Sequence, residues 1–478
     1  MKRKIGFIVG LFLCIFTQAA EPKFEGYQKF SPWHRSRINK LAANCNPSTA
    51  RTNLDINNVR TTILGGGDMF WDLNSARYEI PKLPANSTNP RKHSLYAGAI
   101  WVGGIDAGKQ LKSSAQTYRS ASTLGVAFWP GPLTNDGAAI AYNSECLKYD
   151  RHWKLTKQQI DDHKANTLPG GGLIPGYTPP ATFLDWPAHG DPALNQAFYL
   201  APFEDVDQDG SYNPLNGDYP KIRGDQSIWM VYNDKGNTSG SGSTPIGMEI
   251  QTEAFAYASN DELNNMTFYQ HTILNRSSIR LDSCFMAQWV DPDLGCANDD
   301  YIGCDTSRNL IYTYNADNID ESASGNASYY GSNPPCIGMV SLNNPMNVVG
   351  GFSNSASYPH QDPYYAPDYW NYLNGKWENG SSFYYGGLGY TGTNGVTTTP
   401  TTYMFSGNPY TGTGWSELTN NNASGDRRCY MSLDSIDLNS KSRLSAIKIV
   451  YTLSISPFDP NLASIIDAAD YQEIINNR

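Results

Sequence analysis

Met266-Thr-Phe-Tyr-Gln-His-Thr-Ile-Leu274 and Leu281-Asp-Ser-Cys-Phe-Met-Ala-Gln-Trp-Val290 are the stretches that decide the fold of this chain. Both are rich in β-branched and aromatic residues, which favour the pleated, half-buried surface of a strand. A short polar segment, Asn275-Arg-Ser-Ser278, follows the first stretch and leads to the second. We therefore predict two strands that pair antiparallel across a turn.

The same strand pattern recurs along the chain with few intervening helices. Further strands are predicted at Ile228–Tyr232, Ile250–Tyr257, Leu310–Tyr314 and Ala446–Ser454. Leu95–Val102 and Lys109–Tyr118 flank an Asp-Ala-Gly turn and should form a hairpin. This spacing is typical of a mainly β protein with an antiparallel β-sandwich core and long ordered loops. A short C-terminal helix is predicted at its end, capped by Asp459 with Pro460 in the first turn.

The N-terminus has the pattern of a secretory signal peptide. The basic residues Lys2 to Lys4 precede an apolar run that ends at Phe16, and small residues then predict cleavage after Ala19. The run is shorter than the roughly 20 residues that cross a bilayer, so we expect no membrane span after cleavage.

Four regions are expected along the chain. They are a signal peptide (1–19), an N-terminal extension (20–55), a β-rich region with a calcium loop (56–225), and a β-sandwich region (226–478). The last region also contains an aromatic insertion and the C-terminal helix. A short helix is predicted within Lys154–Lys164, and the Gly- and Pro-rich residues 165–192 are expected to be a loop.

The charge balance limits the class of partner. Acidic residues outnumber basic ones by 45 to 35, which gives a formal net charge of −10. A nucleic-acid partner is excluded because phosphate binding requires a basic surface. An acidic surface suits instead a secreted protein that attracts divalent cations.

Cysteine usage is consistent with export. The chain has eight cysteines, and removal of Cys14 with the signal peptide leaves an odd number. Disulfides are permitted outside the cytosol, and we predict that Cys296 pairs with Cys304 because the two flank one acidic loop. The remaining connectivity stays open. No Cys-x-x-Cys pair is present, which argues against a structural zinc site.

The run Asp205-Val-Asp-Gln-Asp-Gly210 is the most specific chemical motif in the chain. Asp205, Asp207 and Asp209 occupy the first, third and fifth positions of a calcium loop, and Gly210 permits a sharp turn at the sixth. Ca²⁺ prefers several oxygen ligands at about 2.3–2.6 Å and tolerates flexible loops. The alternative is an acidic surface turn without metal.

The rest of the loop departs from the helix-loop-helix pattern. The carbonyl of Ser211 is expected at the seventh position, but Asn216 stands where a bidentate Glu closes the EF-hand loop. Asp218 is therefore predicted as the closing carboxylate. Pro202 and Pro214 also disfavour flanking helices, so the motif predicts a calcium loop outside the EF-hand class.

A second acidic segment follows the strand that ends at Val290. It contains several oxygen-bearing side chains within fifteen residues, namely Asp291, Asp293, Asn298, Asp299, Asp300 and Asp305. These residues are candidates for another cation site, to which Asn315, Asp317 and Asp320 could contribute. The alternative is a set of Asx-turns that bind their own backbone.

Signals for catalysis are weak. No nucleophile elbow or zinc-protease helix is present, and the pair His189 and Asp191 is interpreted as a structural turn. We therefore predict no catalytic residue. For the alternative of a polysaccharide-active hydrolase, the carboxylates beside predicted strands are Asp234, Glu249, Glu253 and Glu262.

Aromatic residues cluster between Tyr364 and Tyr385. Their flat faces can stack on sugar rings, and the candidates for ligand contact are Tyr369, Trp370, Trp377 and Tyr384. The alternative is that these rings pack beneath a long loop.

A set of short motifs covers most of the chain from Leu54 onward. In order they are Gly66-Gly-Asp-Met-Phe-Trp-Asp72, Ala99-Ile-Trp-Val-Gly-Gly-Ile-Asp106, Phe128-Trp-Pro-Gly-Pro-Leu133, Trp186-Pro-Ala-His-Gly-Asp191, Gly247-Met-Glu-Ile250, Asn260-Asp-Glu-Leu-Asn-Asn-Met-Thr-Phe-Tyr269, Gln288-Trp-Val-Asp-Pro-Asp-Leu-Gly295, Asp300-Tyr-Ile-Gly-Cys-Asp305 and Gly425-Asp-Arg-Arg428. The set resembles large secreted and cell-surface proteins of Bacteroidota, many of them type IX secretion cargo. The resemblance implies an exported β architecture rather than an activity. Typical members continue into a sorting domain, whereas this sequence stops at Arg478, so a periplasmic location is an alternative to surface display.

These observations favour a calcium-stabilised β protein of the cell envelope or exterior. We expect a non-enzymatic role in adhesion or surface assembly, with a glycan or another cell-surface component as partner. The alternative is a secreted glycan-binding module or a polysaccharide-active hydrolase.

Overall fold

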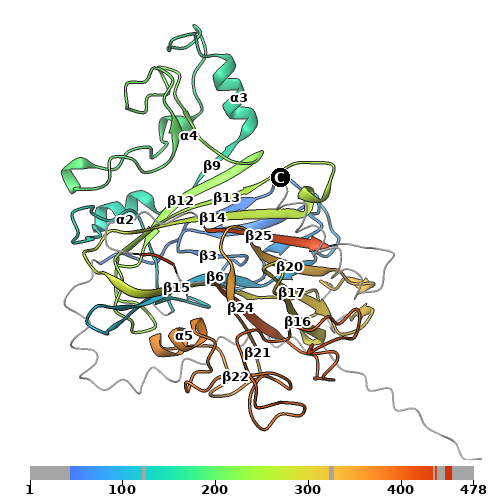
Figure 1. Ribbon diagram of the computed structural model, residues 1–478. Helices are drawn as coiled ribbons and strands as arrows, with labels where there is room; N and C mark the ends of the chain where they lie inside the picture. Colours follow the sequence, from blue (N-terminus) through green and yellow to red (C-terminus); the bar gives the residue numbers. More distant parts are fainter. Residues whose placement is uncertain (1–43, 121–124, 322–327, 434–435, 439–446, 455–478) are drawn as a thin grey trace, which may run out of the picture.

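The computed structural model describes residues 44–120, 125–321, 328–433, 436–438 and 447–454. The expected signal peptide and C-terminal helix lie outside these residues. The described chain is mainly β, with two large sheets in which every strand pair is antiparallel (Figure 1).

The first large sheet has ten strands. In spatial order its main path is β21 (Met346–Ser353), β24 (Arg427–Leu433), β15 (Leu281–Asp291), β6 (Ala97–Asp106), β3 (Asp68–Met69), β2 (Arg60–Leu64), β4 (Tyr78–Glu79) and β5 (His93–Leu95). Beside this path, β1 (Arg51–Leu54) pairs with β2, and β7 (Leu111–Ala115) pairs with β6. The pairing of β6 with β7 confirms the predicted hairpin.

The second large sheet has nine strands. Its path is β16 (Asp300–Asp305), β17 (Leu310–Asn315), β20 (Cys336–Ser341), β25 (Ile447–Ser454), β14 (Met266–Asn275), β13 (Met248–Ala256), β12 (Gln226–Asn233) and β8 (Trp129–Pro130), with β9 (Trp153–Thr156) also on β12. All the strands predicted from residue 228 onward are confirmed as strands, since each coincides with one of these elements or with β15.

Short elements complete the described chain. Three two-stranded sheets pair β10 (Phe203–Glu204) with β11 (Tyr219–Pro220), β18 (Ile319–Asp320) with β19 (Gly331–Ser332), and β22 (Phe383–Tyr384) with β23 (Pro400–Thr401). The helices are α2 (Asn143–Tyr149), α3 (Lys157–Ala165), α4 (Ala181–Leu184) and α5 (Ala366–Leu373), with single 3-10 turns η2 (Pro192–Leu194), η3 (Glu262–Asn265) and η4 (Ala297–Asp299).

The predicted pairing of the two deciding strands is wrong. β14 lies in the nine-stranded sheet between β13 and β25, whereas β15 lies in the ten-stranded sheet between β6 and β24. In the connection, the Asn275 side chain donates to the carbonyls of Ile279 and Leu438, at 2.9 and 3.0 Å, and these bonds hold a non-hairpin conformation. The chain therefore passes from one sheet to the other between two strands that are adjacent in sequence.

Both large sheets combine strands from before and after residue 225. In addition, β1 lies within the segment 20–55 that the sequence predicts to be an N-terminal extension.

The predicted helix within Lys154–Lys164 starts later, because Thr156 still belongs to β9. Thr156 then caps α3 by accepting from the N–H of Gln159, whose side chain accepts from the N–H of Thr156.

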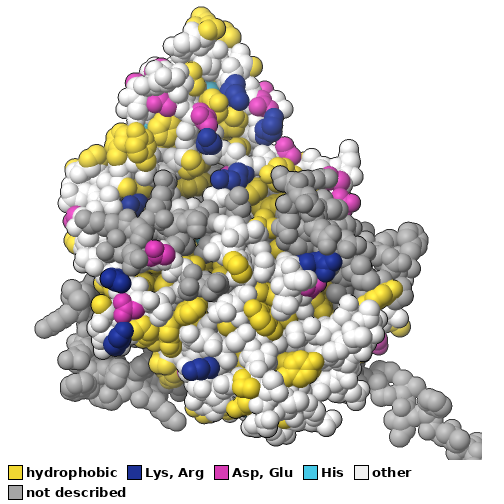
Figure 2. All heavy atoms as spheres, viewed as in Figure 1, with side chains coloured by type: hydrophobic (Ala, Val, Ile, Leu, Met, Phe, Trp, Pro, Cys, Tyr) yellow, Lys and Arg dark blue, Asp and Glu magenta, His cyan; other side chains and the backbone are white. Residues whose placement is uncertain are grey.

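Residues 153–222, called the lobe below, extend beyond the strands at the top of Figure 1. The lobe has a small apolar core in which Trp153 and Trp186 pack against Trp229 of β12. Hydrophobic side chains are also visible on its surface (Figure 2). The large exposed ones are Leu168, Ile174, Leu184, Phe198, Tyr199 and Leu215.

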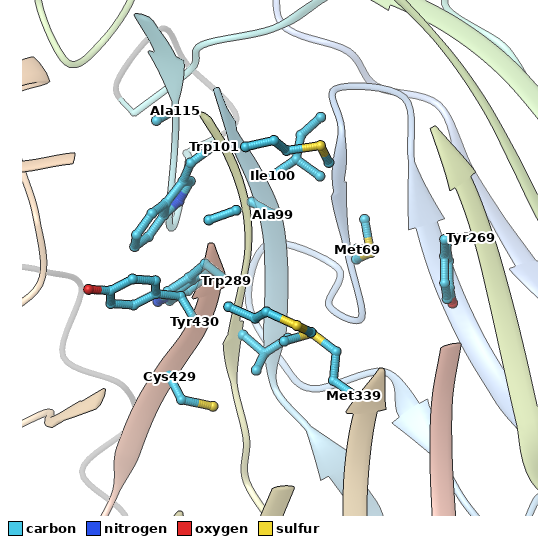
Figure 3. Close-up of a cluster of buried hydrophobic side chains, with 14 of the residues drawn as sticks. Met69, Ala99, Ile100, Trp101, Ala115, Tyr269, Trp289, Met339, Cys429 and Tyr430 are labelled. Carbon is cyan, nitrogen blue, oxygen red and sulfur yellow. The ribbon is translucent and has the colours of Figure 1, made fainter. Parts of the chain in front are cut away.

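The main core contains side chains from both large sheets. Trp101 of β6 stacks on Trp289 of β15 with ring centroids 6.3 Å apart, and Tyr269 of β14 meets Phe70 edge-on at 5.7 Å. Figure 3 shows Met339 of β20 and Cys429 of β24 in the same cluster. Complete burial of one large apolar side chain contributes about 1.5–3 kcal/mol, so this shared cluster stabilises the association of the two sheets.

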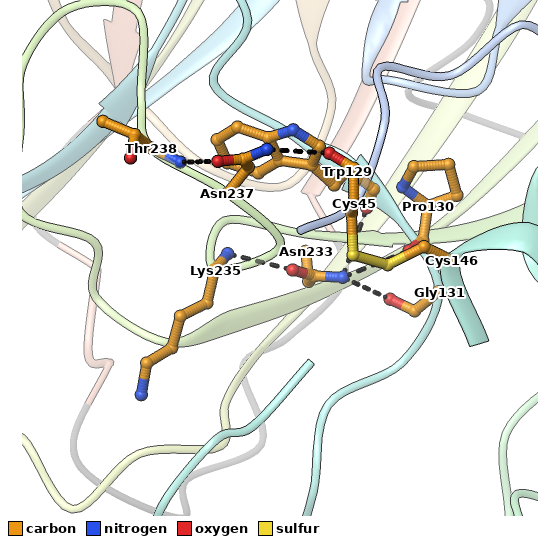
Figure 4. The surroundings of a disulfide bond; sticks show 9 residues. All are labelled: Cys45, Trp129, Pro130, Gly131, Cys146, Asn233, Lys235, Asn237 and Thr238. Carbon is orange, nitrogen blue, oxygen red and sulfur yellow. Dashed lines mark hydrogen bonds between the residues drawn. A yellow bond between two sulfur atoms is a disulfide. The ribbon is translucent and has the colours of Figure 1, made fainter. Parts of the chain in front are cut away.

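A disulfide joins Cys45 to Cys146 (Figure 4). The main chain around it is fixed by Asn233, whose side-chain nitrogen donates to the carbonyls of Trp129, Pro130 and Gly131. The predicted bond between Cys296 and Cys304 is wrong because Cys304 is a buried free thiol. Cys304 faces the main core and donates to the carbonyl of Met404 instead.

Candidate metal centre

The Asp205 motif forms the loop between β10 and β11. Pairing of Phe203 with Pro220 and of Glu204 with Tyr219 closes the base of this loop. Within the loop, Gln208 and Gly210 have φ angles of 62° and 84°. These left-handed conformations, which glycine adopts without strain, fold the segment back on itself.

The three alternate carboxylates converge. Asp205, Asp207 and Asp209 each direct one oxygen to a common region, and these oxygens lie within 4.8 Å of one another. The N–H of Gly210 donates to Oδ2 of Asp205 at 2.8 Å, whereas Oδ1 of Asp205 is buried and has no hydrogen-bond partner among the described residues. One oxygen of Asp205 therefore shapes the turn, and the other is available to a ligand.

The donor set fits a hard divalent cation. In the described part of the chain, Asp205, Asp207 and Asp209 have no basic side chain within ion-pair distance. Three negative charges at this spacing repel one another, and Ca²⁺ offsets that repulsion while accepting oxygen ligands in a flexible loop. The residues present therefore suit Ca²⁺ better than a softer metal, which prefers nitrogen or sulfur.

Ser211 and Asp218 lie beside this centre with structural contacts. The N–H of Ser211 donates to Oδ1 of Asp209 at 2.7 Å. Asp218 is fully buried, and its two oxygens accept from the N–H groups of Val206 and Asn213, each at 2.8 Å. Burial raises the pKa of Asp218, although these hydrogen bonds oppose the rise. Asp218 thus ties the two sides of the loop together and lies outside the converging set.

His189 also supports the loop. Its Nε2 accepts from the N–H of Tyr212 at 2.8 Å, and its Nδ1 lies 3.1 Å from the carbonyl oxygen of Phe198. Asp191 caps η2 by accepting from the N–H of Ala193. Because both ring nitrogens contact main-chain groups, the pair of His189 and Asp191 has the structural role that the sequence suggested.

The second acidic segment divides into two groups and one isolated turn. Asp299 approaches Asp320, with oxygens within 4.8 Å, and Asp291 and Asp293 approach Asp426 at the same spacing. The prediction of one shared site for all of them is therefore wrong. The two groups separate because β15 ends at Asp291, whereas Asp299 ends the 3-10 turn that leads into β16.

Asp305 belongs to neither group. Its Oδ1 accepts from the N–H of Ser307 at 2.9 Å, and its Oδ2 pairs with Arg308 at 2.7 Å. Asp305 therefore stabilises the turn between β16 and β17, which is the Asx-turn alternative.

Buried, under-bonded oxygens surround the first group. Asp300 is fully buried, and its Oδ1 has no hydrogen-bond partner among the described residues, as is also true of Oδ1 of Asp299. Burial raises the pKa of Asp300 well above its ordinary value, and the neighbouring charge of Asp299 adds to the rise. Burial likewise raises the pKa of Asp320 to about 7. Desolvation therefore disfavours the charged forms of these carboxyls, and a bound cation or bound protons would offset that cost.

The second group already contains a cation. The Arg428 guanidinium lies 3.2 Å from Asp291, forms an ion pair with Asp426, and lies 3.8 Å from Asp362. Burial raises the pKa of Asp293 to about 8, with the charge of Asp426 adding to the rise. The guanidinium and bound protons thus account for this group without a metal ion. Sequence reasoning missed Asp426, Asp362 and Arg428 because they lie more than sixty residues from Asp293 along the chain.

Most of the aromatic candidates face the interior. Tyr369 and Trp377 are 4% and 1% exposed, so the prediction that they stack on a ligand is wrong. Tyr369 packs edge-on against Trp101 of the main core. Trp370 is partly buried against Phe285, and Tyr384 is partly buried in β22. The aromatic insertion therefore covers the ten-stranded sheet, which is the packing alternative.

Three of the four carboxylates considered for hydrolysis have structural partners, whereas Glu262 begins the 3-10 turn η3. Asp234 is fully buried and accepts from the N–H groups of residues 246–248. Glu249 pairs with Arg276 at 2.8 Å, and Glu253 pairs with Arg223. Carboxylates held in this way do not form the open pair that glycoside hydrolysis requires.

Comparison of the sequence with protein-family models and with curated proteins gives no match. The Cys45–Cys146 disulfide is compatible with a location outside the cytosol. Within the described residues, none of the helices has both the length and the apolar character required to cross a bilayer.

Proposed function

We propose that this protein is an exported, calcium-stabilised β protein of the cell envelope or exterior that acts in adhesion or surface assembly without catalysis. The observation that carries the proposal is the convergence of three carboxylate oxygens in the loop between β10 and β11. The signal-peptide pattern and the resemblance to secreted Bacteroidota proteins support export. The calcium ion would hold the lobe rather than transmit a signal, because no helix pair flanks the loop to be opened.

The two large sheets suggest how such a protein presents its lobe. Since one core cluster draws on both sheets, we infer that they pack face to face as a β-sandwich. The lobe then projects from a rigid support through β9 and β12, which pair over four residues each.

The surface of the lobe supports a role in contact. Large apolar side chains rarely gather on an exposed surface unless they meet another molecule. Phe198 and Tyr199 are 45% and 62% exposed, and both precede the calcium loop by fewer than ten residues. Calcium would therefore fix the segment that carries them.

A second cation is favoured at Asp299 and Asp320. Their oxygens lie within 4.8 Å of each other, and the unpartnered Oδ1 atoms of Asp299 and Asp300 require compensation in a buried place. Calcium titration should then give two binding events. Asp299→Asn combined with Asp320→Asn should remove one of them and leave the Asp205 loop unaffected.

Calcium-dependent unfolding tests the main proposal. The Asp207→Ala, Asp209→Ala double variant should lose the calcium-dependent rise in melting temperature of the lobe, which corresponds to about 2.7 kcal/mol at 100 times the dissociation constant. The matched control is Asp161→Ala with Asp162→Ala, which removes two carboxylates from α3 of the same lobe.

Two results would overturn the proposal. One is a double variant that keeps the full calcium response while the control also keeps it. The other is release of reducing sugar from a polysaccharide panel by the wild-type protein, which would replace a non-enzymatic role with hydrolysis.

A further inference from the structure

A cavity of about 500 Å³ lies at one edge of the ten-stranded sheet. Residues of β1, β2, β4 and β5 line it, together with residues that lie near the ends of these strands. Four of the lining side chains are guanidinium groups, namely Arg51, Arg60, Arg77 and Arg91. So many arginines in one cavity are unexpected in a chain whose formal net charge is −10.

The cavity has more positive than negative charge. Its acidic lining residues are Asp72 and Glu79. Glu79 pairs with both Arg60 and Arg91, at 2.8 and 2.7 Å. Asp72 pairs with Arg77 at 2.5 Å. Two carboxylates therefore face four guanidinium groups, and Arg51 has no ion pair with any described residue.

The guanidinium groups are held in place before any ligand arrives. Arg60 donates to Glu79 from one terminal nitrogen and to the carbonyl of Leu83 from the other, each at 2.8 Å. Arg91 donates to both oxygens of Glu79 at 2.7 Å. Glu79 is only 2% exposed, so these forks have little freedom. Preorganised guanidinium forks are suited to bidentate contacts with carboxylate or sulfate oxygens.

His93 is a neutral member of the lining. Burial lowers its pKa to about 4, and the charge of Arg77 adds to the lowering. The ring is therefore neutral at physiological pH. His93 is one of the lining residues, and its Nδ1 is buried without a hydrogen-bond partner among the described residues.

The neutral part of the lining consists of hydroxyl and amide groups. Thr52, Asn53 and Thr62 contribute to it, and Thr62 donates to the side-chain oxygen of Asn53 at 2.9 Å. None of the lining residues is Phe, Tyr or Trp. The volume is within the range of sites for small organic ligands and exceeds that needed for one inorganic ion.

We propose that this cavity binds a short acidic saccharide, in which the guanidinium groups contact carboxylate or sulfate oxygens and the Thr and Asn side chains contact hydroxyl groups. The site is independent of the calcium loop and assigns a chemical class of ligand to the molecule. A purely structural ion-pair network does not explain the cavity, because two carboxylates leave the positive charges of two arginines without compensation.

Calorimetric titration tests this proposal with size-matched ligands. A uronate oligosaccharide, a sulfated oligosaccharide, a neutral oligosaccharide of equal length and inorganic sulfate are titrated separately into the calcium-loaded protein. We expect at least one acidic saccharide to bind, the neutral one not to bind, and affinity to fall as salt rises. The difference in affinity between the uronate and the sulfated oligosaccharide shows whether the cavity prefers carboxylate or sulfate groups.

Two variants locate the binding to the cavity. Arg51→Gln and Arg77→Gln should each weaken binding about tenfold or more, as expected for loss of one charge-assisted contact. The matched control is Arg280→Gln, an exposed arginine in the connection between β14 and β15, which should leave affinity unchanged. Arg51 has an exposed side chain with no ion pair to described residues, so its replacement should not impair folding.

Three outcomes of the titrations would overturn the proposal, and one outcome with the variants would do so as well. Neither acidic saccharide binds, the neutral saccharide binds equally well, or inorganic sulfate binds as tightly as the saccharides. It also fails if Arg51→Gln and Arg77→Gln bind like the control while their melting temperatures match that of the wild type. Failure here leaves the calcium proposal untouched, because calcium-dependent unfolding is measured separately.

Discussion

Arg119 and Asp68 form a buried ion pair. Asp68 lies in β3, and Arg119 lies in the loop that follows β7. Nε of Arg119 lies 3.0 and 2.9 Å from the two oxygens of Asp68, and the side chains are 1% and 0% exposed. The indole of Trp71 also donates to Asp68 at 3.1 Å. This pair connects β3 to a distant part of the chain within the protein interior.

Removal of one member of this pair should be strongly destabilising. Asp68→Asn leaves the Arg119 charge without its partner in a desolvated place, and such losses cost about 3–5 kcal/mol. Urea unfolding measures the change. The control is Lys157→Ala, which breaks an exposed pair with Asp161 whose side chains are 58% and 46% exposed, and should cost less than about 1 kcal/mol. Equal effects in the two variants would contradict the prediction.

The Cys45–Cys146 disulfide should be a major source of stability. It closes a loop with a sequence separation of 101 residues, and a loop of about that length is expected to contribute about 4.7 kcal/mol through loss of chain entropy in the unfolded state. We expect Cys45→Ala combined with Cys146→Ala to lower the unfolding free energy by about 2–5 kcal/mol. An unchanged urea midpoint in the double variant would refute this expectation.

Asp218→Asn tests the framework of the Asp205 loop apart from its three converging carboxylates. Asn can accept only one of the two bonds from the N–H groups of Val206 and Asn213, and its amide then faces the other N–H. The unpaired group should cost about 1–3 kcal/mol. Calcium affinity, measured by titration, should fall as well. Asp161→Asn on α3 is the control, and calcium affinity equal to that of the control would show that Asp218 has no supporting role.

His271 should make the protein sensitive to acid. It is fully buried beside Thr252, with Nδ1 and Oγ1 2.8 Å apart, and burial lowers its pKa from 6.5 to about 4. Below pH 6.5 the unfolded chain binds a proton that the folded chain does not, so stability is complete above 6.5 and is lost as pH falls towards 4. The loss amounts to about 3 kcal/mol for this group.

His271→Gln isolates that contribution. The variant should show a flatter dependence of unfolding free energy on pH between 6.5 and 4, while the dependence above pH 7 stays parallel to that of the wild type. Superimposable slopes across the acidic range would mean that His271 is not responsible for acid sensitivity.

Short-range features of the fold were predictable from the sequence. The strand at Met266–Leu274 and the hairpin of β6 and β7 follow from residue type and alternation, which depend only on neighbours in the chain. The Asp205 loop was predictable for the same reason, because its three carboxylates and Gly210 lie within six residues. The sequence pattern at Asp291–Asp305 could not show that these carboxylates separate into two groups. One group forms with Asp320 and the other with Asp426, and both of these residues come from distant segments of the chain.

The sequence by itself determined that the chain is mainly β and that carboxylates converge near Asp207, because hydrophobic period and loop spacing are local properties. Only the tertiary structure decided that β14 and β15 lie in different sheets, that Tyr369 and Trp377 are buried, and that four arginines share one cavity. These outcomes depend on which distant segments bury surface together. That choice minimises exposed apolar area and unpaired charge over the whole molecule, and no single stretch of residues encodes it.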